Sequence, residues 1–566
     1  SVLQTNPYQL IDDLTHVGFR IADEIARSSG MAGDSEHRIR SGLHYAMMQA
    51  LEGGHIFLPL ATLVDYASHL LDLPEEPILR EIDALHLDQR FVLKQLADVP
   101  VVYLASYYRM ECGAAARLHD LNVSFPLEEA LVEEELKRLE QEEAFPLEEK
   151  QRDAVRRAVL NGLTVITGGP GTGKTTIISA ILRYFEAHEL SVALAAPTGR
   201  AAKRITEATG RPAQTIHRLL EYIGAPEENR SENGELLRFT RNESYPLEQD
   251  VVILDEVSMV DLPLLYALLR ALVPGTRLIL AGDTNQLPSV GPGNVLKDII
   301  RSGIVEPIAL TRIFRQEEGS DIVVNAHRII RGEWIDPVTR SKDFIFVQRR
   351  NPDLIRDVLV QLVRDKLPDY VKALQSDIQL ISPTRKGPLG VENLNRILQE
   401  ALNPPREGKK ERSFAGGLFR QGDKVMQIKN NYQKVWTDGE RQGTGVFNGD
   451  IGVIEDLRFF TEEVVILFDE ERRAVYQFSE MNELELAYAI TVHKAQGSEY
   501  PAVVIPLWGV PQPLISRALI YTAVTRARSC VCLVGEAGIF QSMIDNDKEQ
   551  RRYSSLHLQL QELNQR

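Results

Sequence analysis

A glycine-rich loop between a predicted strand and a predicted helix most strongly constrains how this chain can fold. The loop, Gly168–Thr175, reads G-G-P-G-T-G-K-T and fits the pattern G-x-x-x-x-G-K-[ST]. An apolar strand at Val165–Thr167 precedes it, and we expect a helix over 175–187 to follow. Glycines let backbone N–H groups surround phosphate oxygens, and the helix N-terminus adds partial positive charge. An ordinary glycine turn is the alternative, but the flanking strand and helix favour nucleotide binding.

Short apolar strands alternate with helical stretches on both sides of this loop and again later in the chain. Near-continuous apolar strands joined by helical crossovers indicate parallel sheets. We therefore predict the α/β class, with one parallel-sheet domain over 145–320 and a second over 344–566. The predicted strands beyond the first are Val192–Ala196, Val251–Leu254, Leu278–Ala281, Gln379–Ser382, Ala502–Ile505 and Cys530–Val534.

The N-terminal quarter of the chain has a different pattern. Residues 1–125 are mainly helical, with two short β-prone runs at Phe91–Leu93 and Val101–Leu104 and a turn between them that contains Asp98 and Pro100. We interpret this region as a helical N-terminal domain with helix-hairpin-helix and winged-helix-like units. A strongly acidic helix over 126–144 is expected to connect it to the first parallel-sheet domain.

Two segments interrupt the parallel-sheet pattern. Residues 222–247 are polar and contain Asn233-Gly234, which predicts a hairpin insertion in the first domain. Residues 420–485 alternate apolar and polar side chains, with turns at Asn448-Gly449 and Asp469-Glu470, which predicts a small β insertion in the second.

The composition is that of a globular chain with several domains. Its 566 residues predict about three to four domains at roughly 150 residues each. Three cysteines cannot form a disulfide framework, which favours a reducing, cytoplasmic environment. No apolar stretch approaches the ~20 residues that span a bilayer, so we expect no membrane partner. The chain starts at Ser1 and not at a methionine, which we interpret as a processed or engineered fragment.

The net charge restricts how the chain could meet a polyanion. A formal charge of −16 excludes nonspecific coating of nucleic acid by the entire surface. A local positive groove is still compatible with this balance, because nucleic acids respond to the local field.

Two carboxylates follow a predicted strand of the first domain. Asp255 and Glu256 come directly after Val251–Leu254, where parallel strands end beside the phosphate loop. We expect Lys174 to hold the β- and γ-phosphates, Thr175 and Asp255 to ligate Mg²⁺, and Glu256 to activate the attacking water. An Asp-Glu pair after an apolar run is common by itself, and the preceding loop favours the functional interpretation.

Hydrolysis of a triphosphate also needs a sensor and positive charge as the γ-phosphate leaves. Gln286 follows another predicted strand and could sense the γ-phosphate; a plain polar loop is the alternative. Arg315 and Arg526 are candidate cations from the first and second domains, and cleft closure would bring the second to the nucleotide. Surface ion pairing is the alternative role, favoured for Arg312 and Arg528.

Taken in order, these motifs resemble those of a superfamily 1 helicase. The form D-E-V-S-M at Asp255–Met259 resembles the RecD branch, superfamily 1B, and Asn6-Pro7-Tyr8 with Val17-Gly18-Phe19 is similar to stand-alone RecD-like helicases. The resemblance covers nearly the whole chain and implies two RecA-like motor domains, an SH3-like insertion at 420–485 and a duplex-splitting hairpin within 222–247. The motif series is Gln151, Gly168–Thr175, Ala196–Arg200, Asp255–Met259, Gly282–Pro288, Phe314–Gln316, Thr491–Glu499 and Val524–Arg528.

The resemblance also implies individual site residues. Gln151 matches a glutamine that reads adenine, and Glu499 matches an acid that touches the ribose. Thr198 also fits a helix N-cap, and His493 also fits a core histidine. The implied nucleotide-binding loop residues are Gly169, Pro170, Gly171, Thr172, Gly173, Lys174, Thr175 and Thr176. The implied single-strand track comprises Pro197, Thr198, Pro383, Thr384, Arg385, Thr491 and His493.

These motifs predict an ATP hydrolase coupled to DNA unwinding, with ATP and Mg²⁺ as cofactors. The resemblance alone implies 5′ to 3′ movement on single-stranded DNA, action on 5′-tailed duplexes, and roles in DNA repair and recombination. We expect activity as a monomer. The alternatives are a superfamily 1B RNA helicase, an ATP-gated clamp that does not unwind, and a helicase–nuclease. The first is disfavoured because the sequence has no zinc-rich Cys/His module, and the last because it has no clustered acidic nuclease motif.

Overall fold

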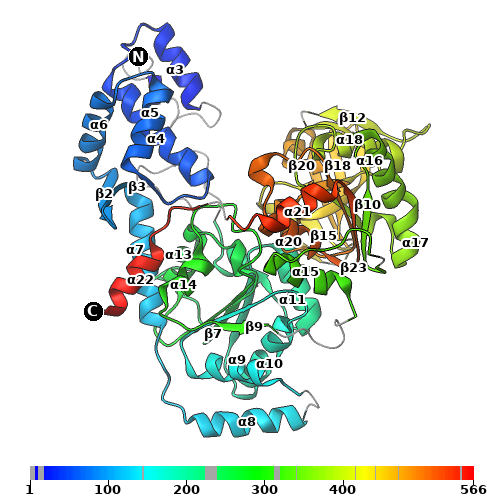
Figure 1. Cartoon of the computed structure of the whole chain (residues 1–566), viewed down its shortest axis with the longest axis horizontal. Coiled ribbons are helices and arrows are strands. Elements are labelled where there is room, and N and C mark those ends of the chain that lie inside the picture. The colour runs from blue at the N-terminus through cyan, green and yellow to red at the C-terminus, as the bar shows by residue number, and fades with distance from the viewer. Residues whose placement is uncertain are drawn as a thin grey trace.

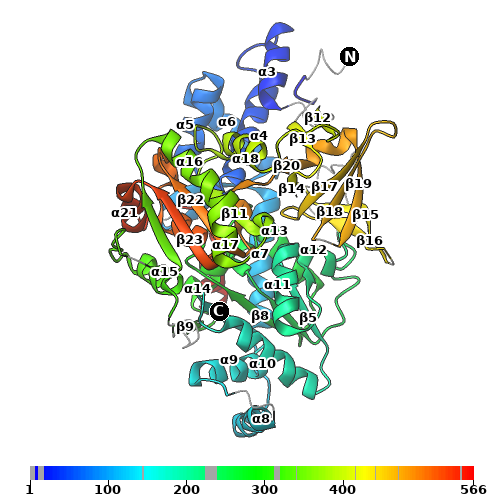
Figure 2. The ribbon, with the colours of Figure 1, turned by 90° about the vertical axis from the view of Figure 1, so that its right-hand side faces the viewer.

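The computed structural model shows two parallel α/β halves, a helical N-terminal region above the first half, and a curled antiparallel sheet attached to the second (Figures 1 and 2). The predicted fold class is thereby confirmed. Among the residues it describes, no helix is both long and apolar enough to cross a bilayer. The described residues are 7–9, 18–142, 146–223, 239–311, 319–339, 341–414, 416–439, 441–469, 471–548 and 551–565.

The first half is a six-stranded parallel sheet in the order β6-β5-β7-β8-β4-β9. Every residue of β7 is buried, as expected for a strand covered by helices on both faces. The strands are β4 Leu163–Gly168, β5 Val192–Ala196, β6 Gln214–Thr215, β7 Val251–Leu254, β8 Arg277–Gly282 and β9 Ile308–Leu310. The helices are α9 Glu149–Leu160, α10 Lys174–Ala187, α11 Gly199–Thr209, α12 Ile216–Leu219, η2 Val257–Met259, α13 Leu262–Ala271 and α14 Val295–Ser302.

The second half is a five-stranded parallel sheet in the order β10-β23-β22-β11-β21. The three strands predicted here are confirmed, and the short β10 and β21 are additional. The strands are β10 Phe344–Gln348, β11 Ile378–Ser382, β21 Ala489–Thr491, β22 Tyr500–Leu507 and β23 Ala527–Gly535. The helices are α15 Asp321–Arg331, α16 Pro352–Gln361, η3 Leu362–Lys366, α17 Leu367–Val371, η4 Gln375–Asp377, α18 Val391–Leu402, α19 Val492–Ala495, η6 Gln512–Leu514, α20 Arg517–Val524 and α21 Ala537–Asp545.

A curled antiparallel sheet interrupts the second half between α18 and β21. Its order is β16-β15-β19-β18-β17-β14-β20, and it has its own apolar core. The predicted turn at Asn448-Gly449 is present, with Gly449 at φ 97°, whereas Glu470 of the other predicted turn lies outside the described residues. The elements are β12 Glu411–Phe414, β13 Gly417–Arg420, β14 Lys424–Gln427, β15 Asn431–Thr437, β16 Gln442–Val446, β17 Ile451–Arg458, β18 Glu463–Phe468, β19 Arg472–Gln477, η5 Phe478–Glu483 and β20 Leu484–Leu486.

The N-terminal region combines helices with a three-stranded antiparallel sheet, one strand more than predicted. The predicted turn is confirmed at Asp98, which forms it together with Ala97, both at positive φ, and is wrong at Pro100, which lies inside β3. Asn6 and Val17, used for the resemblance, lie outside the described residues, as does the tip of the predicted hairpin at 224–238. The elements are η1 Pro7–Gln9, α3 Phe19–Ser28, α4 Glu36–Glu52, β1 Phe57–Pro59, α5 Leu60–Leu71, α6 Glu75–Leu87, β2 Phe91–Leu96, β3 Val99–Leu104, α7 Ala105–Leu121 and α8 Glu129–Glu142.

The C-terminal segment 551–565, here called the C-terminal strap, leaves the second half. Its helix α22, Leu556–Gln565, packs against α7 and α14, so the prediction that all of 344–566 forms one domain is wrong at this end (Figure 1). Glu111 of α7 is buried and accepts hydrogen bonds from the backbone N–H groups of Ser555 and Leu556, both at 3.0 Å. These bonds satisfy N–H groups at the start of α22 that have no partner inside the helix.

A second anchor of the strap lies beside the loop that follows β8. Arg552 donates hydrogen bonds to the carbonyl oxygens of Ser289 at 2.6 Å, Gly293 at 2.8 Å and Gly291 at 3.0 Å. The ring centroids of Tyr553 and His55 lie 5.0 Å apart, and the backbone carbonyl of Tyr553 accepts the Ile56 N–H at 2.7 Å. The strap therefore joins the N-terminal region to the first α/β half.

We predict that Glu111→Ala loosens α22. Removing the acceptor leaves buried N–H and O–H donors unpaired, which should lower the local opening free energy by about 2 to 3 kcal/mol. Burial raises the pKa of Glu111 to about 7. The folded state thus favours the protonated form of Glu111. The stability that Glu111 contributes therefore falls as the pH rises from the ordinary pKa of a glutamate through 7. The effect of Glu111→Ala should therefore be larger near pH 5 than near pH 8.

Native-state hydrogen exchange of the α22 amides measures this local opening. Arg109→Ala, which removes an exposed side chain of the same helix, is the matched control and should leave α22 exchange unchanged. Equal protection of α22 in the Glu111→Ala variant and the wild type would contradict this account of the strap.

Candidate nucleotide and nucleic-acid site

The glycine loop connects β4 to α10 as the sequence predicts. Gly171 and Gly173 adopt φ values of 72° and 81°, in the left-handed region that favours glycine. The Thr172 hydroxyl donates to the Gly169 carbonyl at 2.8 Å, which closes the loop on itself. Lys174 begins α10, so the N-terminus of this helix directly follows the loop, and its partial positive charge can attract an anion there.

Two adjacent acids lie at the carboxyl end of β7. Asp255 and Glu256 are buried, and the Glu256 N–H donates to the Asp255 carboxylate at 2.8 Å. Glu256 adopts φ 54°, a left-handed conformation that costs a non-glycine residue about 1 to 2 kcal/mol. Such strain is typical of a side chain held for a functional purpose.

Nearby cations make the burial of these acids tolerable. Burial alone would raise the pKa of Glu256, but Arg204, Lys174 and Arg526 lower it to about 2. For Asp255, burial and the Glu256 charge raise the pKa, while Lys174 and Arg204 oppose them. The carboxylate that remains poorly compensated is therefore Asp255.

The donor set at this edge fits Mg²⁺. A divalent cation at Asp255 would compensate its buried charge, and the Thr175 hydroxyl is a second hard oxygen donor. Within the described part of the chain, no group of three or more His, Cys, Asp and Glu side chains forms a metal cage.

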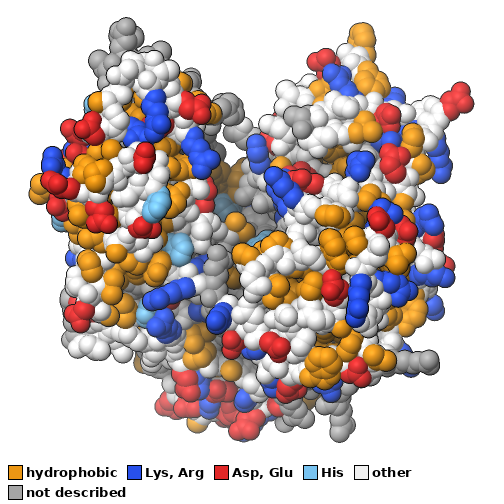
Figure 3. Space-filling view, turned by 45° about the horizontal axis from the view of Figure 1, so that its top comes forward, with side chains coloured by type: hydrophobic (Ala, Val, Ile, Leu, Met, Phe, Trp, Pro, Cys, Tyr) orange, Lys and Arg blue, Asp and Glu red, His pale blue; other side chains and the backbone are white. Residues whose placement is uncertain are grey.

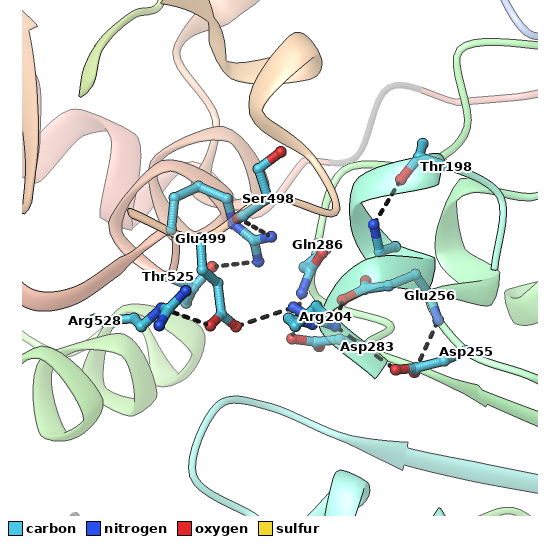
Figure 4. A network of polar contacts seen from close by, with 12 residues as sticks. Thr198, Arg204, Asp255, Glu256, Asp283, Gln286, Ser498, Glu499, Thr525 and Arg528 are labelled. Carbon is cyan, nitrogen blue, oxygen red and sulfur yellow. Dashed lines mark hydrogen bonds and ion pairs between the residues drawn. The ribbon is translucent and has the colours of Figure 1, made fainter. Parts of the chain in front are cut away.

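Arg204 of α11 is a functional candidate that the sequence reasoning missed. Its guanidinium lies 2.5 Å from Glu256 and 3.6 Å from Asp255, and it donates to Glu499 of the second half at 3.0 Å (Figure 4). Arg528, also from the second half, lies 3.5 Å from the other Glu499 oxygen. In the sequence, helical spacing could have drawn attention to Arg204, because Arg200 lies one turn earlier on the same helix. In the structure, Arg200 also contacts the second half, since it donates to the Tyr500 hydroxyl at 2.8 Å.

The second half reaches the glycine loop through α20. The Tyr521 hydroxyl donates to the Asp283 carboxylate at 2.5 Å, and the Leu287 N–H donates to Thr522 at 2.9 Å. A Cβ atom at Gly169 would lie 2.8 Å from the Tyr521 hydroxyl. Neither α20 residue was predicted, since their role depends on the contact between halves.

The structure describes the predicted γ-phosphate sensor and one of the two predicted catalytic arginines, but not the other. Gln286 is buried, its amide nitrogen lies 3.4 Å from Asp283, and its oxygen has no partner among the described residues. Arg526 is buried and donates to the Ser498 and Thr522 carbonyls of its own half, while its charge lowers the pKa of Glu256. Arg315, together with Arg312, lies outside the described residues.

The structure does not bring Gln151 and Glu499 together. Gln151 is the third residue of α9, where its side-chain oxygen accepts the Glu148 N–H at 3.0 Å and its buried amide nitrogen lacks a partner in the described structure. Helix α9 packs on β4 and β9, whereas the contacts of Glu499 are with Arg204 and Arg528. The adenine and ribose roles implied by the resemblance remain predictions.

The predicted track residues lie on both halves. The Thr198 hydroxyl accepts the Ala201 N–H at 3.2 Å, so the N-cap interpretation is confirmed (Figure 4). His493 is exposed, so the core-histidine alternative is wrong; surrounding protein and the Arg552 charge lower its pKa. Gly497 approaches α11 so closely that a Cβ there would lie 2.8 Å from the Thr198 hydroxyl.

The remaining track residues occupy strand ends of the second half. Pro383, Thr384 and Arg385 follow β11, and the Thr491 hydroxyl caps α19. Arg385 is exposed and donates to Glu485 at 2.9 Å. The parallel pairing of β11 with β21 places these two segments at the same edge of the sheet.

Four protein-family models match the chain. They are the ATP-dependent RecD2 DNA helicase HHH domain at residues 1–57, an AAA domain at 151–292, the ATP-dependent RecD-like DNA helicase SH3 domain at 394–468, and the UvrD-like helicase C-terminal domain at 486–534.

Individual proteins are also similar over most of the chain. The ATP-dependent RecD2 DNA helicase of Deinococcus radiodurans is 32% identical, with 96% of this chain and 72% of that protein covered. The RecBCD enzyme subunit RecD of Mycobacterium tuberculosis is 30% identical, with 94% and 93% covered. Among solved structures, the Pif1 helicase from Bacteroides in complex with ADP-AlF3 and ssDNA has a TM-score of 0.43 and 20% identity, covering 71% of this chain and 95% of that one.

We predict that Gly169→Ala impairs ATP hydrolysis through Tyr521. The added methyl group would press on the Tyr521 hydroxyl, and such overpacking typically costs about 1 to 3 kcal/mol, which corresponds to about a 5-fold to 150-fold loss of kcat/KM. Combining Tyr521→Phe with Gly169→Ala removes the hydroxyl on which the methyl group presses. The loss of kcat/KM caused by Gly169→Ala should therefore be smaller in the Tyr521→Phe background than in the wild type. Steady-state ATP hydrolysis measures both effects.

The control for this prediction is Gly538→Ala, where an added Cβ has no neighbour within 4 Å. This variant should retain wild-type turnover. Normal turnover in Gly169→Ala would show that the second half does not approach the glycine loop as the structure describes.

Proposed function

Because the chain belongs to the RecD2 family of ATP-dependent DNA helicases, we propose that its two α/β halves form one ATP-driven motor with the hydrolysis site between them. The prediction of an ATP-dependent DNA helicase is confirmed by this membership, and the RNA-helicase and non-unwinding clamp alternatives are set aside. The observation that carries the site proposal is the approach of Tyr521 to both Asp283 and the Gly169 position.

In the proposed hydrolysis site, the amides of the glycine loop and the Lys174 ammonium hold the phosphates of ATP. Thr175 and Asp255 would hold Mg²⁺, which would supply positive charge to the phosphates when bound. Glu256 orients the attacking water and accepts its proton. The low pKa of Glu256 keeps its carboxylate ionised at neutral pH.

The proposed charge stabilisers come from both halves. Arg526 supports the departing γ-phosphate from the second half, and Arg315 does so from the first. Arg526 needs only a local rearrangement, because its bonds are to carbonyl oxygens and a hydroxyl of its own half and its charge already acts on Glu256. Gln286 responds to the γ-phosphate, and its unpartnered buried oxygen is free for a new hydrogen bond.

For the DNA track, we propose that single-stranded DNA crosses both halves along Thr198, Thr384, Thr491 and His493. The surface is hollowed between the N-terminal region and the second half, and Lys and Arg side chains lie on both sides of the hollow (Figure 3). Contacts to the DNA backbone should dominate, so affinity should fall with salt and depend little on base identity. The hairpin within 222–247 obstructs the second strand, and one copy of the chain suffices for movement.

We predict that Lys174→Ala and Glu256→Gln each lower the kcat of ATP hydrolysis by at least about a hundredfold, because each removes a group that acts on the reacting phosphate or water. Binding of single-stranded DNA should stay within about threefold of wild type, since neither residue lies among the proposed track residues. A malachite-green phosphate assay and fluorescence anisotropy measure these quantities. Wild-type turnover in either variant would refute the site assignment.

We predict 5′ to 3′ movement. In the presence of ATP and Mg²⁺, a duplex with a 5′ single-stranded tail should be unwound, while the same duplex with a 3′ tail or blunt ends should remain paired. Strand displacement of fluorescently labelled duplexes measures this difference, with Lys174→Ala as the inactive control. Preferential unwinding of the 3′-tailed duplex would reverse the proposed polarity without affecting the hydrolysis site.

A further inference from the structure

Arg204 shares one guanidinium group between the two halves. One terminal nitrogen lies 2.5 Å from the Glu256 carboxylate of the first half, and the other donates to Glu499 of the second half at 3.0 Å. The Glu256 side chain is 2% exposed and that of Arg204 is 23% exposed, so water screens this ion pair far less than a surface pair. The planar fork of arginine suits such simultaneous contacts, which lysine cannot reproduce.

The ion pair with Arg204 engages the Glu256 carboxylate, which activates the attacking water in the proposed mechanism. One Glu256 oxygen is engaged by Arg204, and the other has no hydrogen-bond partner in the described structure. A carboxylate held by a charge-assisted hydrogen bond is a weaker proton acceptor and is fixed in orientation. While this contact persists, Glu256 is poorly placed to position and deprotonate water.

The contact also lies one step from the proposed DNA track. Helix α11, which carries Arg204, begins at the Thr198 cap, and Gly497 of the second half packs directly on Thr198. The next residue, Ser498, accepts a hydrogen bond from Arg200 at 3.2 Å, one turn before Arg204. A displacement of segment 497–499 relative to α11 would therefore change the distance between Arg204 and Glu499.

We propose that Arg204 is a positioning residue that restrains Glu256 until single-stranded DNA binds. DNA that contacts both Thr198 and the segment preceding Gly497 shifts the second half along α11, and Arg204 moves with Glu499 away from Glu256. The released carboxylate then orients the attacking water, so hydrolysis becomes dependent on DNA. This inference rests on the proposed roles of Glu256 and of the track residues.

The test is the kcat of ATP hydrolysis of the full chain, with and without a saturating single-stranded oligonucleotide. Arg204→Ala should raise the DNA-free kcat on the order of tenfold, as expected for loss of a hydrogen bond to a charged group. The DNA-saturated kcat should stay within about threefold of wild type, and the KM for ATP should change little. The ratio of the two kcat values should therefore fall.

Two further variants separate this role from a structural one. Arg204→Gln keeps a polar side chain in place of a cationic one and should also raise the DNA-free kcat, which covers a failure of Arg204→Ala to fold. Arg528→Ala removes the other, more exposed Glu499 partner and should leave the DNA-free kcat unchanged. Arg204→Ala combined with Glu256→Gln should lose turnover, because the extra hydrolysis acts through Glu256.

Three outcomes would overturn the inference: an unchanged ratio of DNA-saturated to DNA-free kcat in the folded Arg204 variants, an equal fall of both kcat values, or extra DNA-free turnover that survives Glu256→Gln. An equal fall would instead identify Arg204 as a group that supports the transition state. The Lys174→Ala variant separates failure of this inference from failure of the hydrolysis site. If Lys174→Ala loses turnover, the site assignment stands even when the Arg204 variants contradict the inference.

Discussion

The hydrogen bond from the Tyr521 hydroxyl to the Asp283 carboxylate joins the two α/β halves beside the glycine loop. It brings the Arg526 segment close to two buried acids, Asp255 and Glu256, whose charge needs cations nearby. Lys174 and Arg204 supply positive charge from the first half, and Arg526 supplies it from the second. A site balanced in this way responds to any movement between halves, because such movement changes the compensation of a buried charge.

The path of the chain limits how the halves can move. The second half lies in sequence between the first half and the C-terminal strap, which packs back on α7 and α14. Arg552 of the strap is held by carbonyl oxygens of loop 289–293, which follows Gln286 and Asp283. The second half is thus tethered at both ends to one body, and the loop after β8 contacts both the second half and the strap.

Local patterns predicted much of the fold and of the site. Strands such as β7 and β22 are apolar and buried along nearly their whole length and could be recognised, and the glycine loop has a pattern that only a strand–loop–helix context supports. The edge strands β10 and β21 were missed, because β10 is only partly buried and β21 has only three residues. The strap was missed for another reason: its contacts join Glu111 to Ser555 and Arg552 to Ser289, which are 444 and 263 positions apart in the chain, and no local pattern records such contacts.

The sequence by itself determined the parallel-sheet class, the glycine loop, the positions of Asp255 and Glu256 after a buried strand, and the resemblance to superfamily 1B helicases. These features depend on side-chain periodicity and on residue types within a few positions of one another. Only the tertiary structure decided that Arg204 pairs with Glu256 and Glu499 and that Tyr521 reaches the glycine loop. Such contacts join segments that are remote in the chain, and their geometry follows from how two folded halves pack, which residue spacing does not encode.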